Sequence, residues 1–86
     1  MTGDRMKIAC FGEALIDFLA QPAATPGAPR AFLQFAGGAP ANVAVAAARL
    51  GAQAQFVGML GADMFGDFLF DSLRDAGVDT KQIVRT

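Results

Sequence analysis

The sequence contains no histidine and a single cysteine, Cys10. One thiol cannot form an intramolecular disulfide, and without histidine it cannot complete a Cys/His zinc site. Because Cys10 lies inside an apolar run, we expect a small buried core residue rather than a nucleophile. The single cysteine excludes a fold stabilised by an intramolecular disulfide. With no histidine as well, we expect no metal site within the chain.

Charge is scarce as well. Charged residues make up 17% of the sequence, the net charge is −1, and the seven basic residues are scattered singly. No basic patch is therefore available to neutralise a row of phosphates. We expect no nucleic-acid partner.

Long uncharged apolar runs are also missing. The stretch over residues 8–20 follows Arg5 and Lys7, as the core of a secretory signal would, but Glu13 and Asp17 interrupt it. No segment reaches the ~20 apolar residues that a membrane-spanning helix needs. We expect a cytoplasmic protein without a membrane partner.

Apolar side chains, by contrast, are abundant and make up 53% of the 86 residues. A domain of this length buries only about 60–65% of the surface that its unfolded chain exposes. Two interpretations fit the excess: the chain packs against more protein, or its core is built from many small alanines. We favour the first, because several segments lack an obvious partner within the chain.

The apolar pattern predicts alternating strands and helices. Short buried runs at residues 7–11 and 54–60 are typical of strands in a parallel sheet. Helices are expected at residues 41–50, where Pro40 suits the first helical position, and at about 64–76. This order predicts an α/β fold. Two core strands are too few to complete such a sheet, so we expect residues 1–86 to be part of a larger domain.

The helix ends carry their own signals. Asp63 is placed to cap the second helix, and Gly51 and Gly77 are placed to end the two helices in a left-handed conformation. The apolar stripe of the second helix is Phe65, Phe68, Leu69, Leu73 and Ala76. The other side carries an acidic row that we interpret as a solvated face, formed by Asp67, Asp71 and Asp75.

An extended segment is predicted at residues 30–36, after a proline-rich loop at 21–29. Side chains alternate between two faces in such a segment, and here both faces carry apolar residues. We hypothesise that one face covers a ligand and that the other meets a second subunit. The first face has Ala31, Leu33 and Phe35, and the second has Arg30, Phe32 and Gln34.

The junction between this segment and the first helix is the first candidate site. Gly37 and Gly38 let the backbone approach a ligand without a β-carbon in the way. The helix start offers unpaired N–H groups, and the Asn42 amide can both donate and accept, as a polyol requires. The same residues also fit a purely structural helix start, with Asn42 satisfying the helix end.

Asp17 is the second candidate. A carboxylate within an apolar run must reach water or be hydrogen-bonded, and two neighbouring sugar hydroxyls would supply two donors. An exposed residue at the mouth of a strand explains Asp17 equally well. Phosphate-loop alternatives fail, because the glycines form no G-x-G-x-x-G pattern and no Gly-Lys-Ser/Thr follows.

These residues together resemble the N-terminal signature of the ribokinase/PfkB carbohydrate kinase family, in the order that the family shows over residues 6–79. The run Gly12-Glu13-Ala14-Leu15-Ile16-Asp17 is similar to the first strand of fructokinase-type members. The other matching stretches are Gly37-Gly38-Ala39-Pro40-Ala41-Asn42-Val43-Ala44, Ala47-Ala48-Arg49-Leu50-Gly51, Phe56-Val57-Gly58-Met59-Leu60-Gly61, and Asp63 with Gly66.

The resemblance implies the N-terminal portion of a three-layer ribokinase-like fold with a small β-sheet lid, formed by about residues 18–20 and 30–36. It implies that Asp17, Gly38 and Asn42, with Gly37 beside them, bind sugar hydroxyls, and that the lid builds a homodimer contact. ATP, with Mg²⁺, would donate its γ-phosphate to the sugar. The catalytic base, in a Gly-Ala-Gly-Asp motif, is expected beyond Thr86, so the chain alone should be inactive.

Two departures point to the sugar. Ala39 and Pro40 replace the Lys-Gly pair of ribokinases, and Leu15 stands where ribokinases tend to have Asn. Both changes favour a fructokinase-like specificity over ribose. The alternatives are a 2-keto-3-deoxygluconate kinase, another sugar kinase, a non-catalytic sugar- or nucleoside-binding module, and a Rossmann-like domain.

Overall fold

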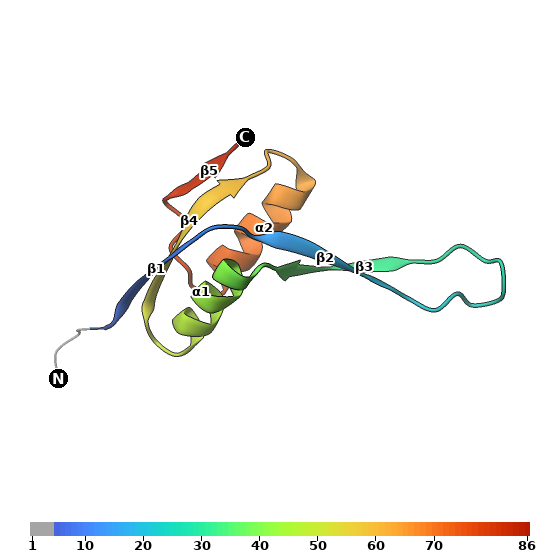
Figure 1. Cartoon of the computed structure of the whole chain (residues 1–86), viewed down its shortest axis with the longest axis horizontal. Coiled ribbons are helices and arrows are strands. Elements are labelled where there is room, and N and C mark those ends of the chain that lie inside the picture. Colours follow the sequence, from blue (N-terminus) through green and yellow to red (C-terminus); the bar gives the residue numbers. More distant parts are fainter. Residues whose placement is uncertain (1–4) are drawn as a thin grey trace.

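The computed structural model describes residues 5–86 as an α/β unit with two separate sheets. A three-stranded parallel sheet in the order β1-β4-β5 forms the core, and β2 and β3 pair as an antiparallel two-stranded sheet (Figure 1). The predicted α/β class is confirmed. The elements are β1 (Lys7–Phe11), β2 (Leu15–Ala20), β3 (Phe32–Gly37), α1 (Ala39–Arg49), β4 (Gln53–Leu60), α2 (Met64–Asp75) and β5 (Ile83–Arg85).

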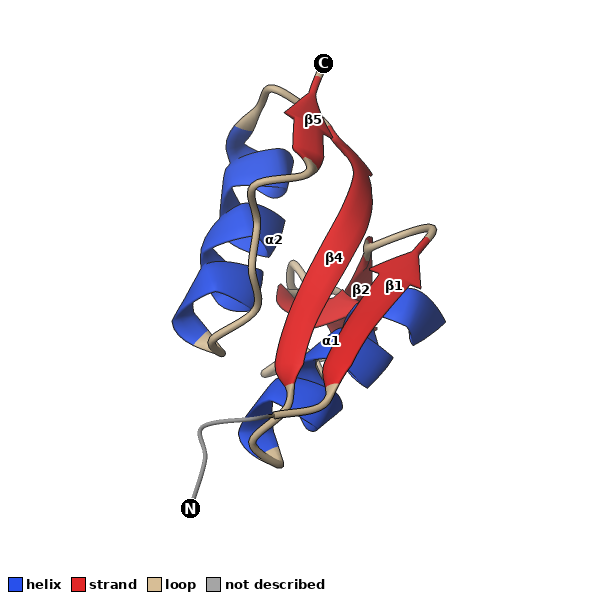
Figure 2. Cartoon of the chain, turned by 90° about the vertical axis from the view of Figure 1, so that its left-hand side faces the viewer, coloured by secondary structure: helices blue, strands red, loops and turns tan. Residues whose placement is uncertain are grey.

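The hydrophobic core lies between the parallel sheet and the helices. Both helices contact β4, and α1 also packs on β1 (Figure 2). Alternate residues of β4 are buried, as a strand with one covered face requires. Cys10 is buried, as the sequence predicted. The core cluster consists of Cys10, Ala41, Ala44, Ala54, Phe56, Leu73 and Val78.

The opposite face of the parallel sheet is apolar and uncovered within residues 5–86. Phe11, Met59 and Val84 are 69%, 63% and 54% exposed. Met59 and Val84 are register partners on neighbouring strands, so their side chains stand on the same face. This face accounts for part of the apolar excess and matches the interpretation that the chain packs against more protein.

The expectation of two core strands was wrong, because β5 adds a third. It pairs with β4 in parallel, and the backbone N–H of Thr86 donates to the Leu60 carbonyl at 2.9 Å. A strand of three residues is too short to show a period-two pattern, so only its pairing reveals it.

The two-stranded sheet, which we call the β-arm (β2, β3 and the loop between them), projects from the core (Figure 1). Its register pairs Asp17 with Phe35 and Leu15 with Gly37. Its strands run further toward the core than the segments 18–20 and 30–36 expected from the sequence, because pairing continues to the junction with α1. Many of its apolar side chains are exposed, including Phe18, Leu19, Phe32, Leu33 and Phe35.

The helix ends follow the sequence signals closely. Asp63 caps α2 by accepting a hydrogen bond from Gly66 N at 2.8 Å. Gly51 and Gly77 adopt positive φ angles of 97° and 91° after the two helices, as predicted. The first helix starts earlier than expected: Gly38 is its N-cap, so Ala39 rather than Pro40 is the first helical residue. Within residues 5–86, neither helix combines the length and apolarity needed to cross a bilayer.

Candidate functional site

Two chain crossings join the β-arm to the core, and they pack against each other. The first runs through residues 12–14 and the second through 37–39. A β-carbon at Gly12 would lie 2.8 Å from Pro40 Cγ, and one at Gly38 would lie 2.8 Å from the Glu13 carbonyl oxygen. The φ angles of Gly12 and Gly38 are 137° and 95°, which other residues rarely adopt. Glycine at both positions therefore permits this close contact.

A hollow of about 310 Å³ lies at these crossings, beside the start of α1. It is open to solvent at the edge where β1 ends and α1 begins, and carboxyl ends of parallel strands are a common place for ligands. Gly38 lines this hollow, whereas Asp17 and Asn42 do not. The lining residues are Gly12, Glu13, Leu15, Gly38, Ala39 and Pro40.

Asp17 lies directly against Gly37. A β-carbon at Gly37 would lie 3.0 Å from Asp17 Cγ and closer still to the Oδ2 atom. Gly37 is buried and Asp17 is exposed. Within residues 5–86 the Asp17 carboxylate makes no hydrogen bond or ion pair. Because Gly37 has no side chain, there is space beside it for the Asp17 carboxylate. The oxygens of this carboxylate accept no hydrogen bond within the described residues.

Asn42 lies one turn into α1. Its backbone N–H donates to the Gly38 carbonyl at 2.9 Å, which is a regular helical bond. In the described part of the chain α1 has no side-chain cap, so the alternative in which Asn42 satisfies the helix end with its amide is not what the structure shows. The structure brings Asp17, Gly37 and Gly38 together at the junction and places Asn42 next along the helix.

Sequence reasoning missed the part played by Gly12, Glu13 and Pro40. The pattern showed Gly12 only as the end of a strand and Pro40 only as a helix starter. Their contact depends on how the two crossings approach in space, which no local pattern encodes. The available signal in the sequence was a pair of glycines, Gly12 at the end of β1 and Gly38 at the start of α1.

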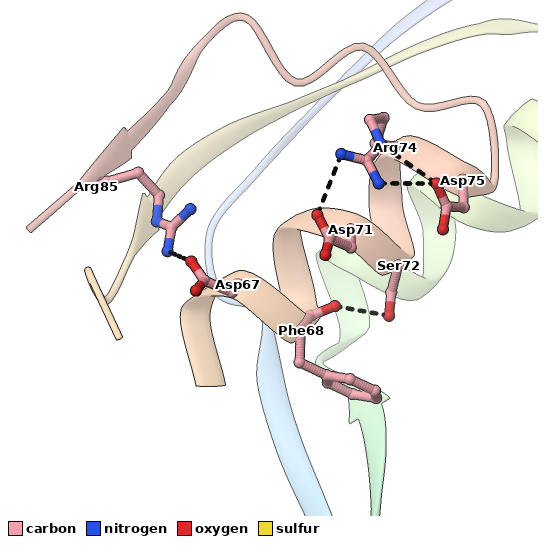
Figure 3. A network of polar contacts seen from close by, with 7 residues as sticks. All are labelled: Asp67, Phe68, Asp71, Ser72, Arg74, Asp75 and Arg85. Carbon is pink, nitrogen blue, oxygen red and sulfur yellow. Dashed lines mark hydrogen bonds and ion pairs between the residues drawn. The ribbon is translucent and has the colours of Figure 1, made fainter. Parts of the chain in front are cut away.

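The start of α2 is closed by the side chains of Asp63 and Arg85. Besides the Asp63 cap, Arg85 donates from Nε to the Gly61 carbonyl at 3.0 Å. Arg85 also pairs with Asp67 (Figure 3). Arg74 pairs with Asp71 at 3.2 Å and with Asp75 at 3.1 Å, and both carboxylates are largely exposed. The acidic row is therefore a solvated face, as expected, and it is partly neutralised by arginines.

Residues 5–86 hold no group of three or more His, Cys, Asp or Glu side chains that could bind a metal ion. The chemistry that the junction offers is hydrogen bonding by an exposed carboxylate, an exposed amide and the backbone N–H groups of an uncapped helix.

Residues 5–86 match the model of the pfkB family carbohydrate kinases. The chain belongs to this family. Fructokinase-1 of Zea mays is 51% identical over 85 residues, which are 98% of this chain and 26% of the maize protein. The PfkB chain thus spans about a quarter of the length of the curated relatives it matches.

Solved structures of pfkB family kinases resemble this chain as well. The fructokinase from Xylella fastidiosa with bound ATP is 73% identical, with a TM-score of 0.90 over 95% of the PfkB chain and 26% of the fructokinase chain. The 2-dehydro-3-deoxygluconokinase of Thermotoga maritima is 34% identical, with a TM-score of 0.82 over 94% and 25%. The ribokinase-like fold expected from the sequence is therefore confirmed.

Proposed function

We propose that these residues form part of the sugar site of a longer ATP-dependent fructokinase. The observation that carries the proposal is the Asp17 carboxylate lying against Gly37 beside the uncapped start of α1. It occurs in a chain that is 73% identical to a fructokinase of known structure. The uncovered apolar face of the parallel sheet supports a longer protein, because such a face is normally buried.

In this proposal each polar group has one task. Asp17 accepts hydrogen bonds from two neighbouring sugar hydroxyls. Asn42 donates to one hydroxyl and accepts from another, and the backbone at Gly37 and Gly38 lets the sugar approach closely. These contacts hold the acceptor hydroxyl in place, which is the main contribution a protein makes to phosphoryl transfer. ATP with Mg²⁺, bound by the remainder of the protein, supplies the γ-phosphate, and a base in a Gly-Ala-Gly-Asp motif is expected there.

The β-arm is the lid of this site in our proposal. The face that carries Asp17 covers the sugar and excludes water from it. The opposite face, with Phe32 59% exposed, meets the lid of a second subunit in a homodimer. The same proposal places the enzyme in the cytoplasm, as expected from the sequence.

A panel of sugars tests the function. The complete protein that carries this chain is assayed with ATP and fructose, glucose, ribose, 2-dehydro-3-deoxygluconate and a nucleoside. We expect the highest kcat/KM with fructose. A preference for 2-dehydro-3-deoxygluconate would instead assign the second candidate, which the Thermotoga relative supports. Sugar binding without phosphorylation would assign the non-catalytic module.

A further inference from the structure

We propose that Phe65, in the first turn of α2, is a positioning residue that holds strand β2, and with it the Asp17 carboxylate, in place for sugar binding. The inference rests on the proposed function and extends it to a residue that lies outside the sugar site. Phe65 belongs to the core unit, whereas Asp17 belongs to the β-arm. The contact between these two parts is the basis of the proposal.

The rings of Phe65 and Phe18 meet edge to face. Their centroids are 6.0 Å apart and their planes stand at 90°, a favourable arrangement for two aromatic rings. Phe65 follows the N-cap Asp63 by two residues, and the bond from Gly66 N to Asp63 fixes this turn of the helix. The core thus presents Phe65 from a well-held position to a side chain of the arm.

A hollow of about 330 Å³ separates β2 from the carboxyl end of β4 and the start of α2. From β2 it is lined by Leu15, Ile16 and Phe18, and from α2 by Phe65, Gly66 and Leu69. Besides the close packing of the two chain crossings, the aromatic contact at this hollow joins a side chain of β2 to the core.

Phe18 and Asp17 are neighbours on one strand, and their side chains point to opposite faces of it. A shift of the strand therefore moves both side chains. Phe18 pairs with Gln34, while Asp17 pairs with Phe35 and lies against Gly37. A movement of the arm that lifts Phe18 from Phe65 also shifts the Asp17 carboxylate relative to α1, while Gly37, which pairs with β2, moves with the arm. Anchoring one face of the strand therefore sets the position of the functional group on the other.

The sequence predicted that Phe65 belongs to the apolar stripe of α2. In the structure Phe65 lines the same hollow as Leu69, but it is 38% exposed and contacts the arm, while Leu69 and Leu73 are buried. Helical spacing in a sequence does not show whether an apolar residue faces the core or a hairpin that projects from the edge of the core.

The test uses three variants of the complete protein: Phe65→Ala, Phe65→Leu, and Met64→Ala as a matched control. Met64 is the exposed neighbour of Phe65 and does not line the hollow. We expect Phe65→Ala to raise the KM for fructose about threefold to tenfold, with the KM for ATP within about twofold of the unmodified protein. Phe65→Leu should restore most of the loss, and Met64→Ala should behave as the unmodified protein.

Amide hydrogen exchange gives a readout that needs no activity. In Phe65→Ala, residues 15–20 and 32–37 should exchange faster while β4 stays unchanged. An unchanged fructose KM together with unchanged exchange in the arm would overturn the proposal. So would an equal rise of both KM values with faster exchange in β4, which marks a purely structural residue. If the unmodified protein phosphorylates no sugar, the proposed function fails, and arm exchange alone decides whether Phe65 anchors β2.

Discussion

The two helices of this chain begin in opposite ways. At α2 the Asp63 side chain accepts from the Gly66 N–H, and Arg85 ties the same turn to Gly61 and Asp67. At α1 the N-cap is Gly38, no side chain caps the helix within the described chain, and an exposed carboxylate stands close by. The first arrangement satisfies its polar groups internally, whereas the second leaves the helix N–H groups without a side-chain partner in the described residues.

In our proposal, this contrast separates a purely structural glycine-containing turn from one that binds a ligand. Gly61 and Gly66 allow a tight turn that its own residues complete. Gly37 and Gly38 make space, since a β-carbon at either position would meet Asp17 or the backbone near Glu13. Substitutions at the two helix starts should therefore have separable effects on stability and on sugar binding.

The largest expected effect is at Gly38. Gly38→Ala must accept both a φ of 95° and a contact of 2.8 Å with the Glu13 carbonyl oxygen. Gly51→Ala is a matched control, because φ is 97° there but no atom lies within 4 Å. We expect Gly51→Ala to cost about 1–2 kcal/mol of unfolding free energy and Gly38→Ala roughly 1–3 kcal/mol more. Urea unfolding of the complete protein measures both.

Only Gly38→Ala should also reduce fructose affinity. Equal destabilisation by the two alanine variants, with equal fructose binding, would show that the close approach at the junction has no special role.

A smaller effect is expected at the closed helix start. Asp63→Ala removes the cap of α2 and should cost about 1 kcal/mol of unfolding free energy, while fructose affinity stays unchanged. Asp63→Asn, which retains a capping oxygen, should keep nearly full stability. Thermal unfolding and sugar titration of the two variants check this. A loss of fructose binding at full stability would mean that the α2 start is functional too.

The sequence predicted most of the core but not how its parts meet. Residues 7–11 and 54–60 were recognised because buried runs of strand length are distinctive, and α2 was recognised because Asp63 and Gly77 mark its ends. Strand β5 was missed because three residues carry no periodicity. The arm was only partly placed, since antiparallel pairing with Leu15–Ala20 decides where β3 ends.

For the candidate site, the spacing of Gly37, Gly38 and Asn42 along the chain is enough to identify the junction. It does not reveal the contact of Asp17 with Gly37, which depends on the register of two strands. The contact of Phe18 with Phe65 depends in addition on how the arm leaves the core. Both are long-range consequences of packing.

The central claim is that Asp17 binds sugar hydroxyls at the open helix start. Isothermal titration calorimetry of Asp17→Ala in the complete protein tests it most directly, with Asp63→Ala as the control. Removing one charged hydrogen-bonding group should cost about 1.5–3 kcal/mol, so fructose should bind roughly tenfold to a hundredfold more weakly while ATP affinity stays nearly unchanged. Fructose binding equal to that of the unmodified protein would contradict the account.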